Sequence, residues 1–543
     1  AAMDYLQDQA TTRRGKEGKE SEPVALIAAA VTHYTSRAGD PQLHTHVVIP
    51  NIGLRRDGTV GTVQSHSFYE TRLAAGSLYQ AELAYRMSEM GYEIENGVKG
   101  SFRLANVNLP LEQTFSKRGE QIKAVALETG REGVEARAAI TVVTRPAKVK
   151  TSLGERESHW REEAKAFSQI QHPERGANSK SVQPSALFDR ISEAAGVITE
   201  SKSVFLEHDL IREMAKISYG LYSAATIRAA VVNAPLRDRV VVLDDKRHTT
   251  AEMVAIEQSM AEAAKMLVFR HGYRVDAEAK IGVSLSDEQK AAVLSAIGNS
   301  ALAVIQGRAG VGKTMSLAMI HEAYKRAGYR VEGVALSGQA AKVLMEQTGI
   351  ESRTIASWLQ RHEMNSKTVL IVDEAGMVGS KMTEQILQEA QRARAKVILV
   401  GDERQLQPIA AGSALQAVDR VLIRENAQYS SQILTIRRQK ELWMRDTVRA
   451  AAEGRIGAAI DYLHEHKMIR VDTNAISARE ALVKDFLQSG TDNAAVITMR
   501  RSDAYKINKM IREALQASGQ IGNDAIEFHN GKEKMSLAIG DRV

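Results

Sequence analysis

The chain has 543 residues and a formal net charge of +6 at pH 7, from 72 Lys and Arg against 66 Asp and Glu. This length predicts roughly three or four domains, and the mildly basic balance is compatible with a polyanionic partner without requiring one. The absence of cysteine excludes disulfides and thiolate metal ligands. No apolar run is long enough to span a bilayer, so we expect a cytoplasmic protein without membrane insertion.

The first residues, 1–10, favour a helix, and residues 11–22 form a polar, charged stretch without periodicity. Such a stretch is typical of an exposed loop. It contains Arg13 and Arg14, for which two interpretations remain open. They belong to a solvated charge cluster, or they contact DNA phosphates.

A histidine-rich stretch follows at residues 33–51, HYTSRAGDPQLHTHVVIPN, and predicts a turn followed by a strand. Successive side chains on a strand point to opposite faces, so His44 and His46 lie on one face. His33 precedes the turn, where a paired strand would bring it alongside the other two. Three neutral imidazoles that converge favour a divalent-metal site. On spacing alone, a cupin-like or zinc-hydrolase-like pocket remains an alternative.

The wording of this stretch resembles the histidine motif of conjugative relaxases of the TraI/TrwC type. The resemblance continues through the runs DGT, AAGSLYQAEL and FSKR, over about the first 165 residues. It implies that His33, His44 and His46 hold one divalent ion, Mg²⁺ or Mn²⁺. In that family the ion binds the scissile phosphate of single-stranded DNA.

Other features of the first third are also read through this resemblance. TRPAK, residues 144–148, resembles a basic element of the family, and the polar, Pro/Gly/Ser-rich residues 171–185 predict a linker. The nucleophilic tyrosines of the family precede the region that matches. Tyr5 lies in a helical stretch and is a poor candidate for that role. We therefore expect a fragment that lacks the nucleophilic tyrosine and the last helicase motifs.

A phosphate-binding loop is predicted further along, after a mostly helical segment. The run LAVIQ predicts a buried strand, and the next residues match G-x-x-x-x-G-K-T ahead of a helix. Backbone amides of such a loop close around phosphates, and the helix N-terminus adds a favourable dipole. Lys313 would reach the β- and γ-phosphates and Thr314 would coordinate Mg²⁺. The predicted loop comprises Gly307, Arg308, Ala309, Gly310, Val311, Gly312, Lys313 and Thr314.

Two further buried strands end in acidic residues. TVLIVDEAG ends at Asp373, predicted to hold Mg²⁺, and Glu374, predicted to polarise the attacking water. VILVGDERQLQP repeats the arrangement. Because ligands gather at the carboxyl ends of parallel strands, these elements predict one nucleotide site.

Together, these motifs resemble superfamily 1 helicases of the RecD-like group. The resemblance implies that Gln289 reads adenine, that Gln405 senses the γ-phosphate and that Arg438 is an arginine finger. Trp358 stands where a base-stacking aromatic is expected, although a core tryptophan fits equally well. The cofactors implied are ATP and Mg²⁺.

The whole chain thus predicts a multidomain α+β and α/β protein. Its expected parts are a partial relaxase domain with an antiparallel sheet that carries the histidine motif, a linker, a small helical domain, a P-loop parallel-sheet motor domain and part of a second one. Their expected bounds are 1–170, 171–185, 186–280, 281–431 and 432–543.

The implied function is metal-dependent, strand- and site-specific nicking of plasmid origin-of-transfer DNA by tyrosine transesterification, coupled to ATP-driven unwinding. The family implies single-stranded and origin DNA, relaxosome accessory proteins and the type IV secretion coupling protein as partners in a bacterial cytoplasm. Two alternatives stay open. One is a helicase whose histidine module is only a DNA-binding or structural metal domain, and the other is a non-enzymatic DNA-binding remnant.

Overall fold

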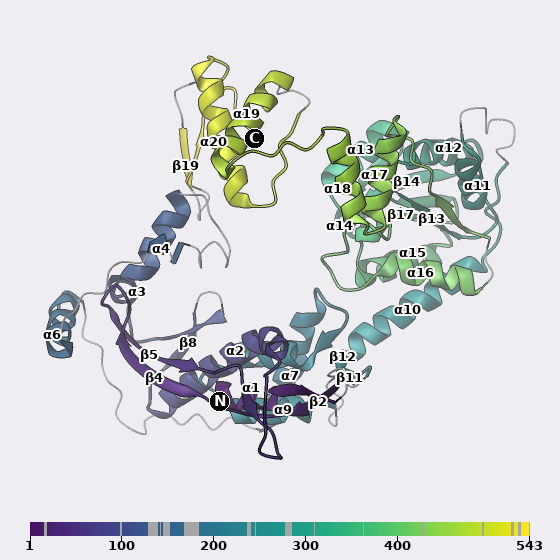
Figure 1. The fold of residues 1–543 in the computed structure, drawn as a ribbon. Coiled ribbons are helices and arrows are strands. Elements are labelled where there is room, and N and C mark those ends of the chain that lie inside the picture. Colours follow the sequence, from purple (N-terminus) through teal and green to yellow (C-terminus); the bar gives the residue numbers. More distant parts are fainter. Residues whose placement is uncertain are drawn as a thin grey trace. The chain divides into compact units, whose positions relative to one another are not determined.

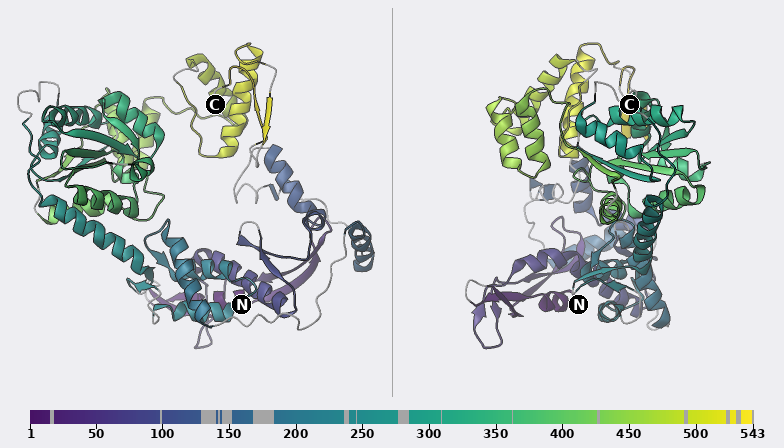
Figure 2. Two further views of the ribbon diagram at one scale, coloured as in Figure 1. Left: turned by 180° about the vertical axis from the view of Figure 1, so that it is seen from behind. Right: turned by 90° about the vertical axis from the view of Figure 1, so that its right-hand side faces the viewer.

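The computed structural model describes most of the chain, in two compact units (Figures 1 and 2). The first unit comprises Ala1–Ala10, Gln64–Phe102 and Glu174–Met468, and the second comprises Thr11–Val63, Arg103–Pro173 and Ile469–Val543. Within the described residues, no helix has both the length and the apolar character needed to cross a membrane. The described residues are 1–15, 19–97, 100–128, 140–141, 143–144, 152–167, 184–235, 240–244, 246–276, 285–308, 310–361, 363–425, 428–490, 494–522, 526–529 and 534–541.

The N-terminal region consists of short antiparallel strands and helices, which confirms the α+β part of the predicted fold. Its elements are α1 (Ala2–Asp8), β1 (Thr11–Arg14), β2 (Glu20–Pro23), β3 (Ala25–Leu26), β4 (Ala29–Thr35), β5 (Pro41–Val48), β6 (Gly53–Leu54), β7 (Val60–Gly61), α2 (Ser65–Glu89), β8 (Ile94–Asn96), β9 (Phe102–Leu104), α3 (Leu109–Thr114), α4 (Lys117–Glu128) and α6 (Leu153–Ala164).

The exposed loop expected over residues 11–22 is in fact a hairpin, because β1 and β2 pair antiparallel. The buried Thr12 anchors it by donating from Oγ1 to the Thr62 carbonyl at 2.9 Å. Polar residues on both faces leave no alternation in the sequence, so periodicity could not reveal these strands. Most of the expected basic element at 144–148 and of the expected linker at 171–185 lies outside the described residues.

One hydrophobic core joins the relaxase-like region to the helical segment that follows. Leu78 of α2 is fully buried in a cluster with Ile191, Ile211 and Ile227, which come from α7, α8 and α9. The core of α2 therefore continues beyond the boundary expected at residue 170, while one boundary between the two compact units lies between Pro173 and Glu174. The elements of this segment are α7 (Pro184–Thr199), β10 (Phe205–Leu206), α8 (Glu207–Ile217), α9 (Ala224–Val232), β11 (Val241–Val242), β12 (Arg247–Thr249) and α10 (Ala251–Val268).

The motor is a parallel sheet between two helical layers, as predicted, with strand order β15-β14-β16-β17-β13-β18. Its elements are α11 (Asp287–Ala296), β13 (Leu302–Gly307), α12 (Lys313–Arg326), β14 (Arg330–Ala335), α13 (Gly338–Thr348), β15 (Glu351–Thr354), α14 (Ile355–Gln360), β16 (Thr368–Val372), η4 (Ala375–Met377), α15 (Ser380–Ala393), β17 (Lys396–Gly401), α16 (Ala414–Arg424), β18 (Ser430–Ile433), α17 (Leu442–Ala452) and α18 (Ile456–Glu465).

Strand alternation fills both faces of this sheet. Leu302 and Val304 of β13 pack into the cluster that holds α15 and α16, whereas Ala303 and Ile305 pack into the cluster that holds α11 and α12. Both faces of each central strand are buried, which explains the continuous apolar runs in the sequence.

Residues on the far side of both expected motor boundaries contribute to the motor core or its sheet. Helix α10, expected in the helical domain, buries Met260 and Leu267 in the motor core against α15 and α16. The expected start of the second motor domain at residue 432 lies within β18, which pairs with β13 in the motor sheet. The motor core therefore extends beyond 281–431 at both ends.

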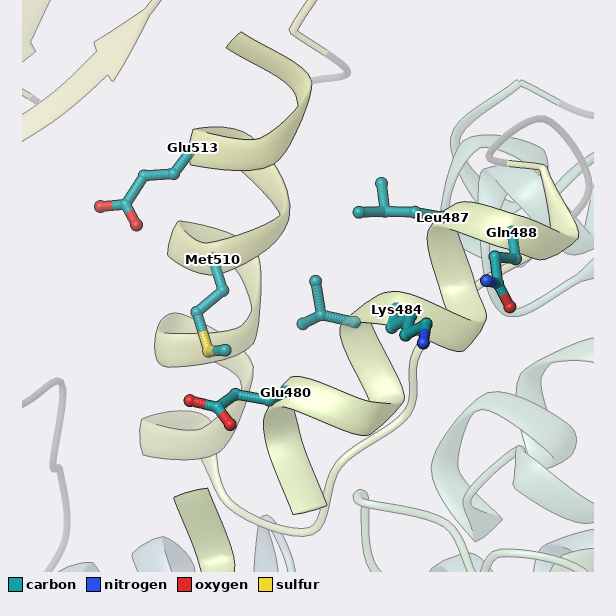
Figure 3. A pocket seen from close by; sticks show the side chains of 7 residues that line it. Glu480, Lys484, Leu487, Gln488, Met510 and Glu513 are labelled. Carbon is teal, nitrogen blue, oxygen red and sulfur yellow. The ribbon is translucent and has the colours of Figure 1, made fainter. Parts of the chain in front are cut away.

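The last part of the chain comprises α19 (Ala475–Ser489), α20 (Arg501–Ala517), β19 (Ile526–His529) and β20 (Lys534–Leu537). Figure 3 shows a groove of about 530 Å³ between the two helices. Apolar, charged and neutral polar side chains from both helices line it: Glu480, Val483, Lys484, Leu487, Gln488, Met510 and Glu513. None of the predicted site residues lies in it.

Candidate functional site

The three histidines converge on one face of the β4–β5 hairpin. His33 pairs directly with His44, and His46 pairs with Val31, so all three side chains share a face. The ring centroids are 5.5 Å apart for His33–His44, 4.9 Å for His33–His46 and 5.0 Å for His44–His46. Their potential ligand nitrogens lie within 4.8 Å of one another. This is the convergence that the sequence predicts.

The protonation of one imidazole is fixed by its neighbour. Nδ1 of His44 lies 2.9 Å from the Gln42 carbonyl oxygen. Since a carbonyl oxygen only accepts, Nδ1 carries the proton and donates it. The lone pair is then on Nε2, as a metal ligand requires, and the hydrogen bond from Nδ1 to Gln42 orients the ring. The donor set therefore fits a divalent ion such as Mn²⁺ or Zn²⁺.

The two arginines of β1 differ in their surroundings. Arg14 forms ion pairs with Glu22 at 3.1 Å and with Asp57 at 2.7 Å. Hydrogen bonds from Thr59 and Arg14 lower the pKa of Asp57, so this carboxylate stays charged. Arg14 is thus already paired within the protein, and the exposed Arg13 is the better candidate for a DNA phosphate.

The phosphate-binding loop joins β13 to α12, as predicted. Gly310 and Gly312 adopt φ of 78° and 85°, in the left-handed region that favours glycine. A Cβ at Gly312 would also lie 2.6 Å from Nε2 of Gln289. Lys313 donates from Nζ to the Gly307 carbonyl at 2.8 Å, so its ammonium lies across the loop. Ala309 lies outside the described residues.

Gln289 braces this loop from the first turn of α11. Its Nε2 donates to the carbonyls of Val311 and Gly312, each at 3.1 Å. Its Oε1 accepts from the Ser286 amide at 3.0 Å, and the side chain is only 2% exposed. The amide is thus fully used within the protein, and this geometry supports the loop rather than a free adenine-reading group.

Asp373 and Glu374 directly follow β16. Burial and the neighbouring Glu374 charge raise the pKa of Asp373, and Lys313 opposes them. Glu374 has φ of 50°, an uncommon left-handed conformation for a residue with a side chain. Strain of this kind often accompanies a functional site. The positive charge of Lys313 thus favours the ionised form of Asp373.

A cavity of about 110 Å³ lies at the ends of β13, β17 and β18, beside the phosphate loop. Asp402 lines it and accepts from Nε2 of Gln405 at 3.3 Å. Arg308 lines it too, and its guanidinium lies 3.7 Å from Glu453. Predicted residues from two strand ends thus meet at one edge of the sheet.

The chain segment after β18 closes over the phosphate loop. The backbone amides of Arg437 and Arg438 both donate to the Gly310 carbonyl, at 2.8 Å and 2.9 Å. Space at Gly310 is so limited that an added Cβ would lie 2.9 Å from the Arg438 Cβ. The side chain of Arg438 therefore begins directly above the loop, where an arginine finger would act.

Two aromatic candidates are core residues. Trp358 is fully buried and donates from Nε1 to Glu332 at 3.2 Å, so the core interpretation holds and its ring is not available for base stacking. Tyr5 is 2% exposed, and burial raises its pKa to about 12. It is unsuited to act as a nucleophile, as predicted.

Sequence reasoning missed Glu288, next to Gln289. Its carboxylate accepts from the amides of Leu434 and Thr435, each at 2.9 Å, and from the Thr435 hydroxyl at 3.0 Å. Burial alone would raise the pKa of Glu288, but these hydrogen bonds outweigh it and lower the pKa. An acidic residue in the first turn of a helix is usually explained by its favourable interaction with the helix dipole. The sequence therefore gave no sign that Glu288 bonds the segment after β18.

Comparisons with known proteins cover both sites. A family model described as TrwC relaxase matches residues 1–167, and one described as an AAA domain matches residues 284–474. The chain thus carries a region that matches the TrwC relaxase domain and, after it, a region that matches an AAA domain. Its AAA domain implies nucleotide binding, and its three-histidine cluster lies within the matched relaxase region.

Among the proteins that this chain resembles, conjugal transfer protein TraA of Rhizobium radiobacter is 34% identical over 369 residues, which cover 64% of this chain and 33% of that protein. Multifunctional conjugation protein TraI of Escherichia coli is 25% identical over 450 residues, which cover 77% of this chain and 25% of that protein. The chain thus spans a quarter to a third of the length of these two relatives.

Among solved structures, conjugative relaxase TrwC in complex with origin-of-transfer DNA is 30% identical and covers 30% of this chain and 61% of that chain, with a TM-score of 0.29.

Proposed function

We propose that this relaxase–helicase segment uses His33, His44 and His46 to hold a divalent ion for the nicking of origin-of-transfer DNA. The observation that carries the proposal is the convergence of the three imidazoles, with ligand nitrogens within 4.8 Å. The ion would supply Lewis-acid polarisation of the scissile phosphate. The residues present would orient that ion, with Nε2 of His44 held toward it by the Gln42 hydrogen bond.

The same proposal assigns the second site to ATP hydrolysis that drives DNA unwinding. Lys313 would neutralise the β- and γ-phosphates, and Thr314 and Asp373 would hold Mg²⁺. Glu374 would orient the attacking water, while Gln405 and Arg438 would respond to the γ-phosphate. Relaxosome accessory proteins and the secretion coupling protein are proposed as partners.

The metal site is tested by calorimetric titration of the chain with Mn²⁺. Wild type should bind one ion, and His44→Ala should lose most of the affinity because one of three ligands is gone. His271→Ala is a matched control, since His271 is an exposed histidine outside the cluster. Equal isotherms for wild type and His44→Ala would refute the assignment.

A second experiment, with DNA, distinguishes a metal ion that takes part in nicking from one that is purely structural. Single-stranded origin DNA that carries one phosphorothioate at the scissile position should bind better with Mn²⁺ or Cd²⁺ than with Mg²⁺, because softer ions accept sulfur. If metal binds but the phosphorothioate has no effect on metal preference, the ion does not contact that phosphate. The alternative of a structural metal module would then be correct.

A further inference from the structure

We propose that α6 is a positioning element for the three-histidine site. Arg156 and Trp160 of this helix hold the tip of the β4–β5 hairpin in the register that sets His33 beside His44. The inference rests on the proposed metal site and adds residues far along the chain to the control of its affinity. Neither arginine nor indole would touch the ion.

The contacts come from one face of α6. Trp160 donates from Nε1 to the Gly39 carbonyl at 2.8 Å, and Arg156 donates from Nη1 to Oγ1 of Thr35 at 3.0 Å. Residues four apart lie on the same side of a helix, so both donors face the hairpin together. Each bond joins positions 121 apart in the chain. The helix therefore binds the end of the hairpin through two hydrogen bonds, one to Thr35 at the end of β4 and one to Gly39 in the turn.

A third connection runs through Lys117. Its ammonium lies 2.7 Å from the Glu163 carboxylate on α6 and 3.8 Å from the Asp40 carboxylate in the turn. Asp40 is 2% exposed, although it belongs to a hairpin tip. Its backbone amide donates to Oγ of Ser36 at 3.1 Å, which closes the turn. Asp40 is thus held by Ser36 within the turn, and its carboxylate lies near Lys117, which also contacts α6.

The hairpin has little else to hold its register. In the described part of the chain, β4 and β5 pair only with each other, and most of their residues are exposed. An isolated two-stranded hairpin is marginally stable in water. The register also shifts between His33 and Thr35, next to a proposed ligand. A slip of one residue would turn His33 to the opposite face, away from His44 and His46.

Arg156 bonds the residue just beyond that irregularity, and Trp160 bonds the turn itself. Both bonds therefore favour the one register in which the imidazoles converge. Loss of either should leave the ligands in place but lower the fraction of hairpins that are ready to bind. Affinity falls in proportion to that fraction.

The test is calorimetric titration with Mn²⁺ of the whole chain carrying Arg156→Ala or Trp160→Phe. The second change removes only the indole N–H donor and keeps an aromatic ring. Each should weaken Mn²⁺ binding roughly 2- to 10-fold, the range for one hydrogen bond. Arg161→Ala is the matched control, because Arg161 is an exposed arginine of the same helix. It should bind like wild type.

Arg156→Lys should restore part of the affinity, because it returns a cationic donor. Thermal unfolding of each variant is measured in parallel. If Arg156→Ala and Trp160→Phe bind Mn²⁺ as tightly as wild type, α6 does not position the site. If Arg161→Ala weakens binding equally, general destabilisation accounts for the effect and the inference is wrong. If wild type and His44→Ala both fail to bind, the proposed metal site itself is refuted.

Discussion

The hydrogen bonds of Gln289 give a prediction that distinguishes support of the phosphate loop from recognition of adenine. If Gln289 braces the phosphate loop, Gln289→Ala should weaken ATP and GTP binding equally. Two bonds of 3.1 Å to the Val311 and Gly312 carbonyls are lost from a side chain that is 2% exposed. At about 0.5–1.5 kcal/mol each, they sum to about 1–3 kcal/mol. That sum sets an upper limit of roughly 5- to 150-fold in affinity.

Titration with fluorescent analogues of ATP and GTP, in the presence of Mg²⁺, measures both affinities. Gln289→Glu is the informative second variant. It keeps the acceptor oxygen that caps α11 through the Ser286 amide, but it lacks the Nε2 donor. Its loss of affinity should approach that of the alanine variant. A loss confined to ATP, with GTP binding unchanged, would refute the bracing role and support adenine reading.

Three further predictions concern a core leucine, a buried lysine and a glycine of the phosphate loop. Leu78→Ala should lower the free energy of unfolding by about 2–5 kcal/mol in urea denaturation, because Leu78 is fully buried in the core shared by α2 and α8. Burial lowers the pKa of Lys396 to about 7, so the unfolded chain binds more protons above that pH. Stability should therefore rise from pH 7 toward pH 10 in wild type, and more steeply than in Lys396→Met; equal slopes would contradict this. Gly310→Ala should abolish nucleotide binding in the same fluorescence titration, since its Cβ would lie 2.9 Å from that of Arg438; wild-type affinity would show that the loop adapts.

Local patterns were sufficient to predict both sites in outline. Strand alternation placed His44 and His46 on one face, and the turn before them made His33 their partner across the hairpin. The phosphate loop and the acidic end of β16 follow from a strand, a glycine-rich turn and a helix in sequence order. Each of these features depends on residues close together in the chain.

Long-range pairing could not be predicted in the same way. Arg14 is paired with Asp57, which lies 43 residues away, and neither neighbourhood in the sequence marks that contact. The bracing role of Gln289 depends on how α11 packs against the phosphate loop, which no periodicity describes. The packing of α10 against the motor could not be predicted for the same reason, since its ordinary helical pattern does not specify its partner.

The core that α2 shares with α7–α9 limits where a relaxase region can be exchanged between related chains. A relaxase exchanged at a boundary near residue 170 would leave Leu78 and Ile211 without the apolar surfaces that cover them. Recombination at that point would give two poorly folded products. A cut between α9 and α10 would keep both cores intact, because α10 belongs to the motor core. A segment that keeps the N-terminal core whole therefore includes α7–α9 together with α2.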